Sequence, residues 1–200
     1  RDRRQRQMCI RDRLYAVSMG LGVTVTAMVS RRVGENKRKE AAEITGQIIW
    51  ISGVISIFVA IIGYHFAADM LELLGANKSV IEIGESYTTI LFCGSASIMY
   101  LFLLNAAFRG AGDASIAFKS LAIANGTNII LDPCLIFGIG FFPELGVKGA
   151  AIATTIGRTI GVLYLAYVLF QGNNRLKLRV RDLVVRLSII KRIITISVYG

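Results

Sequence analysis

The chain has 200 residues, of which 54% are hydrophobic and 18% charged, and its formal net charge at pH 7 is +10. Ordinary soluble domains are less apolar and contain about a quarter charged residues, so this composition excludes them. The charges are clustered, and the uncharged runs Ile44 to Gly63 and Ser86 to Phe108 reach the ~20 residues that a transmembrane helix needs. The sequence therefore predicts an all-α, polytopic transmembrane helix bundle.

The excess of positive charge would indicate a nucleic-acid-binding protein if the chain were soluble. Here the Lys and Arg residues lie in short connections between apolar runs, and outside residues 1–13 they form no surface interleaved with aromatic residues. The positive-inside rule of membrane proteins predicts this placement. We therefore expect the lipid bilayer, and not nucleic acid, to be the partner of this chain.

Residues 1–13 carry six of the 23 basic residues, and Met8 to Arg13 looks like the translation of a sequencing adapter. We expect this segment to be a non-native tail, which is excluded from fold reasoning. The alternative is a native basic segment beside the membrane. Because an apolar helix begins directly afterwards at Leu14, we also expect the chain to be a fragment of a longer protein.

Five apolar segments are predicted to cross the membrane within residues 14–170. They are residues 14–30, 44–63, 86–108, 116–139 and 146–170. Residues 66–85 form a mainly acidic connection, in which Met70 to Ala76 is expected to be a short interfacial helix that ends at a glycine. Residues 171–192 are a basic connection, and residues 193–200 begin a further span.

The basic residues are distributed unevenly between the two sides of the predicted bundle. Five lie in residues 31–43, two in 109–119 and seven in 171–192, and these connections share one side. The connections on the other side contain only Lys78 and Lys148. Since short cytoplasmic connections are rich in Lys and Arg, we expect the first set to be cytoplasmic.

One carboxylate, Asp132, lies inside a segment long enough to cross the bilayer, where charge is costly and usually functional. Asn128 lies one helical turn before it, and Thr154 lies on the next helix, about 10 Å from the same end. Pro133 cannot donate a backbone hydrogen bond, which leaves the carbonyl of Ile129 without its usual partner. These oxygen ligands suit Na⁺ or a shared proton, and no other metal site is indicated.

Arg158 complicates this interpretation of Asp132. It lies one turn after Thr154 and could pair with Asp132 as a fixed counter-ion, which would make proton exchange harder. The alternative to an ion site is therefore a structural ion pair that holds two helices together.

Four motifs occur in a fixed order along the chain. They are Ser30 to Gly34 after a helix of small residues, Asn105 to Asp113, Asn128 to Pro133, and Gly146 to Thr154. In this order they resemble the multidrug and toxic compound extrusion (MATE) family, over about Leu14 to Gly200. The resemblance implies a twelve-helix antiporter of two six-helix lobes. This chain would hold helices two to six of the amino-terminal lobe, the inter-lobe connection and the start of helix seven.

The resemblance also implies a site and a function. Many members bind H⁺ or Na⁺ in this lobe through an Asp on helix one and an Asn, an Asp and a Thr on helices five and six. Asn128, Asp132 and Thr154 match the last three, whereas Arg158 has no place in that site. The implied protein is an inner-membrane (plasma membrane) exporter of small cationic or amphipathic organic compounds in exchange for H⁺ or Na⁺. It would need no cofactor and be a monomer when full length.

Two other functions are weighed against transport. A lipid-linked oligosaccharide flippase of the same superfamily would favour an interior rich in Arg and Lys, whereas Arg158 is the only basic residue predicted inside the membrane. An intramembrane enzyme would need a nucleophile with a base, or a metal cluster, at membrane depth. The sequence predicts no second carboxylate and no His there, so we expect a transporter and not an enzyme.

Overall fold

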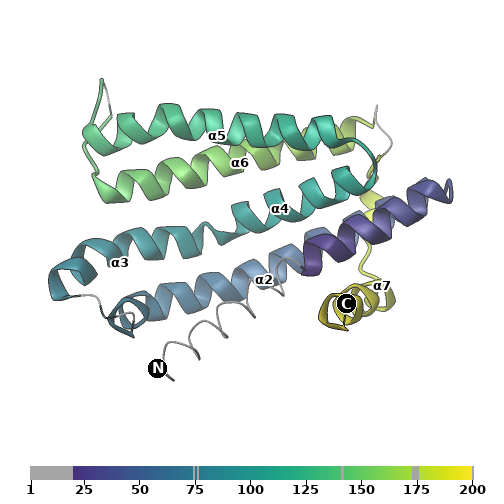
Figure 1. The fold of residues 1–200 in the computed structure, drawn as a ribbon, viewed down its shortest axis with the longest axis horizontal. Coiled ribbons are helices and arrows are strands. Elements are labelled where there is room, and N and C mark those ends of the chain that lie inside the picture. The colour runs from purple at the N-terminus through teal and green to yellow at the C-terminus, as the bar shows by residue number, and fades with distance from the viewer. Residues whose placement is uncertain (1–19, 74, 76, 141, 173–175, 200) are drawn as a thin grey trace, which may run out of the picture. The chain divides into compact units, whose positions relative to one another are not determined.

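The computed structural model describes residues 20–73, 75, 77–140, 142–172 and 176–199. Its elements are a helix over residues 20–34, α2 (Arg38–Leu73), α3 (Lys78–Cys93), α4 (Ser95–Gly110), α5 (Ala114–Phe137), α6 (Val147–Gln171), the 3-10 helix η1 (Val180–Leu183) and α7 (Leu187–Tyr199) (Figure 1). No strand occurs among the described residues, and the predicted all-α class is confirmed. The expected non-native tail, residues 1–13, lies outside the described residues.

Within the described part of the chain, α2, α5 and α6 are long and apolar enough to cross a membrane. A further span is formed if Gly84–Cys93 and Ser95–Gly110 are taken together, although they are bent by 45° at a break. We expected one continuous helix over residues 86–108. The break falls at Gly94, where a Cβ atom would lie only 2.7 Å from the Thr155 hydroxyl oxygen, so that α6 can approach closely.

The second helix, α2, is longer than the expected span over residues 44–63. The interfacial helix expected over Met70 to Ala76 is not a separate element, because α2 runs without interruption to Leu73. Gly63 does not end the helix: it is buried, and a Cβ atom there would collide with Phe92 of α3. The chain turns instead around Gly75, whose φ is 81°, and α3 begins within the connection expected over residues 66–85.

Three helices end in the same way, with a residue of positive φ just after the helix. These residues are Asn36 (61°), Gly112 (84°) and Gly138 (66°). In each case the next N–H donates to a carbonyl five residues earlier, from Lys37 to Arg32 at 2.8 Å, from Asp113 to Phe108 at 2.9 Å and from Ile139 to Cys134 at 3.1 Å. This Schellman-type motif satisfies carbonyls at the helix end and turns the chain sharply.

Contacts divide the chain into two compact units. The first comprises the described residues within 20–50, 102–114 and 168–199, and the second comprises those within 51–101 and 115–167. The helices α2, α4 and α6 contribute residues to both units. The first unit contains the charged turn before α2 and the basic segment after α6, and the second contains the acidic residues 66–85 and the residues of the predicted ion site.

In the first unit, the motif Asn105 to Asp113 packs against the helix over residues 20–34. Ala106 and its neighbours are fully buried, and the Thr26 hydroxyl donates to the Ala106 carbonyl at 3.1 Å. A Cβ atom at Gly110 would lie 2.6 Å from the Thr26 carbonyl oxygen. The small residues of the motif therefore allow two membrane helices to approach closely.

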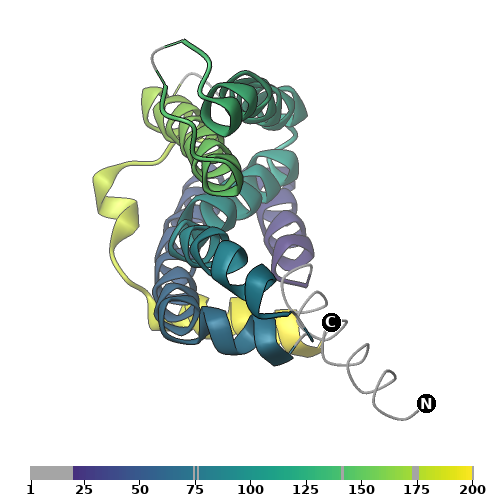
Figure 2. The ribbon, with the colours of Figure 1, turned by 90° about the vertical axis from the view of Figure 1, so that its left-hand side faces the viewer.

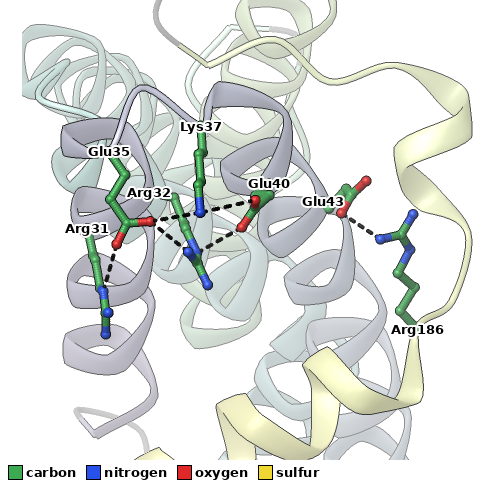
Figure 3. A network of polar contacts seen from close by, with 7 residues as sticks. All are labelled: Arg31, Arg32, Glu35, Lys37, Glu40, Glu43 and Arg186. Carbon is green, nitrogen blue, oxygen red and sulfur yellow. Dashed lines mark hydrogen bonds and ion pairs between the residues drawn. The ribbon is translucent and has the colours of Figure 1, made fainter.

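A network of charges holds the turn that precedes α2 (Figure 3). Glu35 accepts hydrogen bonds from Arg31 Nε at 3.0 Å and from Arg32 Nη1 at 2.7 Å. Glu40 pairs with Arg32 at 3.1 Å, and Lys37 lies 3.5 Å from Glu35 and 3.7 Å from Glu40. The bonds from Arg31 and Arg32 are the main cause that lowers the pKa of Glu35 from 4.5 to about 2.

Polar side chains of α2 fix the segment that leads into α7, which sequence analysis did not foresee. Gln47 is fully buried, donates to the Val184 carbonyl at 2.9 Å and accepts the Arg186 N–H at 2.8 Å. The Arg186 guanidinium also pairs with Glu43 at 2.7 Å (Figure 3). The signal in the sequence is the spacing of Glu43 and Gln47, which places two polar side chains on one face of α2.

The last helix begins at Leu187 and not at residue 193, so the basic segment over residues 171–192 is not wholly irregular. Lys191 and Arg192 are exposed on α7, whereas Ile193 is completely buried. The helix is therefore amphipathic, and its charges do not mark its beginning.

Candidate ion-binding site between α5 and α6

The helices α5 and α6 lie side by side in the second unit (Figures 1 and 2). Their close approach depends on glycines of α6. A Cβ atom at Gly157 would lie 2.6 Å from the Ala124 carbonyl oxygen, and one at Gly161 would lie 3.0 Å from the Ser120 carbonyl oxygen. At Gly149 it would collide with the backbone of α5. Spaced by multiples of four, these glycines form one face of α6 and allow the two backbones to touch.

The connection between the two helices also fixes their register. Gly138 ends α5 in the left-handed conformation, and the returning chain donates two hydrogen bonds to the end of the same helix. They run from Leu145 N–H to the Leu135 carbonyl at 3.0 Å and from Gly146 N–H to the Ile136 carbonyl at 3.2 Å. Since α6 begins at Val147, its first turn is held beside the last turn of α5.

The structure brings Asn128, Asp132 and Thr154 together. The Asn128 side-chain nitrogen donates to Asp132 Oδ1 at 3.1 Å and to Thr154 Oγ1 at 3.2 Å. All three residues are half-buried. One amide therefore joins a carboxylate of its own helix to a hydroxyl of the neighbouring helix, and the three side chains present several oxygen atoms in one place.

Asp132 lies on the packed stripe of α5 and not on its exposed side. The buried residues of this helix are Ile116, Ala117, Ser120, Ala124 and Leu135. Asn128 and Asp132 continue that stripe at spacings of four, whereas Ile129 and Ile130 are 71% and 67% exposed. The carboxylate is thus directed to the side on which α5 meets its neighbours.

Pro133 lies inside α5, which continues to Phe137 as one helix. Proline has no N–H group, so the carbonyl of Ile129 has no partner from that position in the helix. This carbonyl belongs to the residue that follows Asn128.

The possible ion pair between Arg158 and Asp132 is not formed. Of the ion pairs between described residues, none includes either side chain. The reason is the antiparallel register of the two helices. Asn128 and Thr154 lie at the same level. Asp132 lies one turn from that level towards the α5–α6 connection, and Arg158 lies one turn from it in the opposite direction. At ~1.5 Å per residue, this separates the two charges by about 12 Å along the helices.

Comparison with known proteins decides the family. The family model described as MatE matches residues 9–134. The chain belongs to the MatE family. The resemblance predicted from the four motifs is thereby confirmed, together with the class of multi-pass membrane protein.

MatE relatives and a solved structure agree with this assignment. The probable multidrug resistance protein NorM of Thermotoga maritima is 32% identical over 162 residues, which are 79% of this chain and 33% of that protein. The FAD transporter of Shewanella oneidensis is 28% identical over 156 residues, which are 78% of this chain and 34% of that protein. A multidrug resistance MATE family transporter of the MOP superfamily, in an inward-facing conformation, has a TM-score of 0.80 at 28% identity and covers 92% of this chain and 41% of its own. The chain thus spans about a third of the length of the curated MatE relatives that it matches.

Sequence analysis identified the polar residues of this MatE chain but missed part of what positions them. It did not foresee the contacts at Gly157 and Gly161, which bring one face of α6 against α5. Gly157 also lies directly beside Asn128, since a Cβ atom at Gly157 would lie 3.4 Å from the Asn128 Cβ atom. The spacing of these glycines was the available signal.

Proposed function

We propose that this chain is part of a secondary active transporter that exports small organic compounds in exchange for H⁺ or Na⁺. In this proposal Asp132, Asn128 and Thr154 bind the coupling ion. The observation that carries it is the single Asn128 amide that contacts both the carboxylate and the hydroxyl between two apolar helices. An ionisable group at membrane depth is costly, and such groups usually mark an ion or substrate pathway.

The chemistry of the three side chains suits reversible binding of a small cation. As placed, the Asn128 nitrogen donates to the Asp132 carboxylate. Half a turn of the amide would present its oxygen instead, so that Asn128 can stabilise a free carboxylate or ligate a cation. The Thr154 hydroxyl can accept or donate in the same way. The polar groups of the site would therefore have hydrogen-bond partners or ligands both when the site is free and when an ion is bound.

Transport follows if ion binding changes the relative stability of two conformations. An ion can shift that equilibrium only by binding one conformation more tightly than the other. The proposed link is Pro133, which adjoins the carboxylate and removes one hydrogen bond from α5. A helix weakened there is easier to bend, and neutralising Asp132 would change how closely it packs against α6.

The proposed orientation places residues 31–43, 109–119 and 171–192 in the cytoplasm and the protein in the inner (plasma) membrane, since these connections hold most of the Lys and Arg residues. The proposed substrates are cationic or amphipathic organic compounds. One relative is named as a FAD transporter, so a test should include an anionic substrate as well. The relatives described above are transporters and not enzymes.

The test is transport by the full-length protein in lipid vesicles under an imposed gradient of H⁺ or of Na⁺. A cationic dye and FAD are offered separately as substrates. We expect one gradient to drive export of at least one substrate and Asp132→Asn to reduce it to the rate of protein-free vesicles. The matched control is Glu144→Gln, which removes a carboxylate from the exposed connection between the same two helices. Full gradient-driven transport by Asp132→Asn would refute the proposal.

A further inference from the structure

The segment that follows α6 alternates between apolar and basic residues. Leu176 and Leu178 are 0% and 2% exposed, and Lys177 and Arg179 between and after them are exposed. An extended chain directs successive side chains to opposite sides, which explains this pattern. The segment is tied to the end of α6 by a hydrogen bond from Leu178 N–H to the Leu169 carbonyl at 3.1 Å.

The basic side of this segment borders a surface cavity of about 330 Å³. Its lining residues are Arg38, Lys39, Ala42, Gly172, Lys177, Arg179, Arg181 and Asp182. Five of these eight carry positive charge, against one carboxylate. That carboxylate accepts the backbone N–H of Arg179 at 2.9 Å, so it is already engaged within the segment.

The five cations are not neutralised by the part of the chain that the structure describes. None of them takes part in an ion pair between described residues, in contrast to Arg31, Arg32 and Lys37 in the nearby turn. Five like charges around one cavity repel one another and create a strongly positive potential. An anion in the cavity would relieve this repulsion.

Gly172 contributes to the shape of the cavity. Its φ is 72°, and a Cβ atom there would lie 2.5 Å from Cδ and Cε of Lys177. The glycine therefore allows the chain to turn directly after α6 and the Lys177 side chain to cross over the turn. The aliphatic part of Lys177, a residue that lines the cavity, therefore lies directly against Gly172.

The position of the cavity indicates which anion it meets. It lies where α2 begins, at Arg38, and where α6 ends, at Gln171, and both helices are long and apolar enough to cross a membrane. The ends of spanning helices lie at the level of the lipid headgroups. Phosphate groups are the anions found at this level, and Arg and Lys bind them through charge-assisted hydrogen bonds.

We propose that this cavity is a binding site for a phosphate group, presented by an anionic lipid headgroup or by a soluble phosphate compound. The two cations from the start of α2 and the three from the segment after α6 would surround the phosphate. This site is separate from the residues proposed to bind the coupling ion, and it does not depend on that proposal.

The experiment is lipid binding to the purified full-length protein by native mass spectrometry. The probes are short-chain phosphatidylglycerol, short-chain phosphatidylcholine and inorganic phosphate. The cavity variant carries Lys177→Gln, Arg179→Gln and Arg181→Gln. The matched control carries Arg109→Gln, Lys119→Gln and Lys191→Gln, which remove the same charge from residues that do not line the cavity.

We expect the cavity variant to bind phosphatidylglycerol on the order of 100-fold more weakly, since each Lys or Arg near a lipid surface contributes about fivefold. The control should bind nearly as well as the wild type. Equal loss in both variants, or loss in neither, would overturn the proposal. If the cavity variant does not fold, Arg181→Gln alone should weaken binding about fivefold, and unchanged binding would overturn it equally.

A competition measurement identifies the source of the phosphate group. If inorganic phosphate displaces phosphatidylglycerol from the wild type and from the control variant, but not the residual lipid from the cavity variant, the cavity binds soluble phosphate compounds. If it does not, while phosphatidylcholine binds weakly, the cavity recognises anionic lipid. Both results support the phosphate site, whereas equal binding of phosphatidylcholine and phosphatidylglycerol contradicts it.

Discussion

At the scale of single residues, the ion site depends on Thr154 through one hydrogen bond. Its hydroxyl accepts the Asn128 amide at 3.2 Å and is the contribution of α6 to the site. Thr154→Val keeps the shape of the side chain and removes the oxygen. Because a hydrogen bond contributes ~0.5–1.5 kcal/mol, we expect the apparent affinity for the coupling ion to fall roughly 2- to 10-fold.

The measurement for Thr154→Val is the ion dependence of transport by the full-length protein. The control is Thr159→Val, because the Thr159 hydroxyl donates only to the Thr155 carbonyl of its own helix, at 2.7 Å. An unchanged ion dependence in Thr154→Val, or an equal change in the control, would show that the hydroxyl does not serve the site.

Glu35 makes the turn before α2 sensitive to acid. Arg31 and Arg32 lower the pKa of its carboxyl group to about 2 from an ordinary value of 4.5. A group whose pKa is lower in the folded state stabilises that state above its ordinary pKa and loses this contribution as the pH falls towards the lower value. We therefore expect Glu35→Gln to lower the melting temperature slightly at pH 6, and the difference from wild type to vanish between about pH 4.5 and pH 2. A difference that stays constant over this range would contradict the assignment.

At the scale of elements, the contact between α5 and α6 requires glycine at residue 157. Gly157→Ala would place a methyl group 2.6 Å from the Ala124 carbonyl oxygen, and a backbone atom cannot give way easily. We expect a loss of ~1–3 kcal/mol in stability, measured as a lower melting temperature in detergent, because overpacking forces the backbones apart.

Gly126→Ala is the matched control for the same helix pair. Gly126 lies within α5 and has no heavy atom within 4 Å of its Cβ position among the described residues. Alanine is the better helix former, so this variant should keep or raise the melting temperature. If both variants behave alike, the stripe of glycines on α6 does not set the helix spacing.

The elements also show what a single sequence can and cannot predict. Uncharged runs predict where the chain crosses the membrane, because the length and low polarity of a segment determine whether it can span the bilayer. They do not predict that α2 continues past Gly63 or that a span breaks at Gly94, because each glycine serves a contact with another helix. The start of α7 was misplaced for a related reason, since Lys191 and Arg192 are charged residues on a helix and not part of a loop.

The same limit applies to the candidate site. Asn128 and Asp132 share a helix face by spacing alone, and the short connection between two helices suffices to expect Thr154 nearby. The exclusion of Arg158 needs the register of α5 against α6, which depends on the backbone contacts of Gly149 and Gly157. The basic cavity was hidden for the same reason, because Arg38 and Lys39 are far in sequence from the segment after α6.

At the scale of the whole molecule, the chain spans about a third of the length of its curated relatives. The matched part is 33% of one relative and 34% of the other described above. The proposed exchange of ion and substrate is a property of the full-length protein in a membrane. What this chain contributes is a half-buried carboxylate joined through one amide to a second helix. The basic cavity at the helix ends would add contacts with the surrounding phosphate groups.

The most direct measurement is the binding of Na⁺ and of H⁺ to the purified full-length protein, by titration calorimetry for Na⁺ and by proton uptake after a pH jump for H⁺. Wild-type protein should bind one of the two ions, and Asp132→Asn should lose that binding while Glu144→Gln retains it. If Asp132→Asn binds both ions as the wild type does, Asp132 is not the site of the coupling ion and the account is wrong.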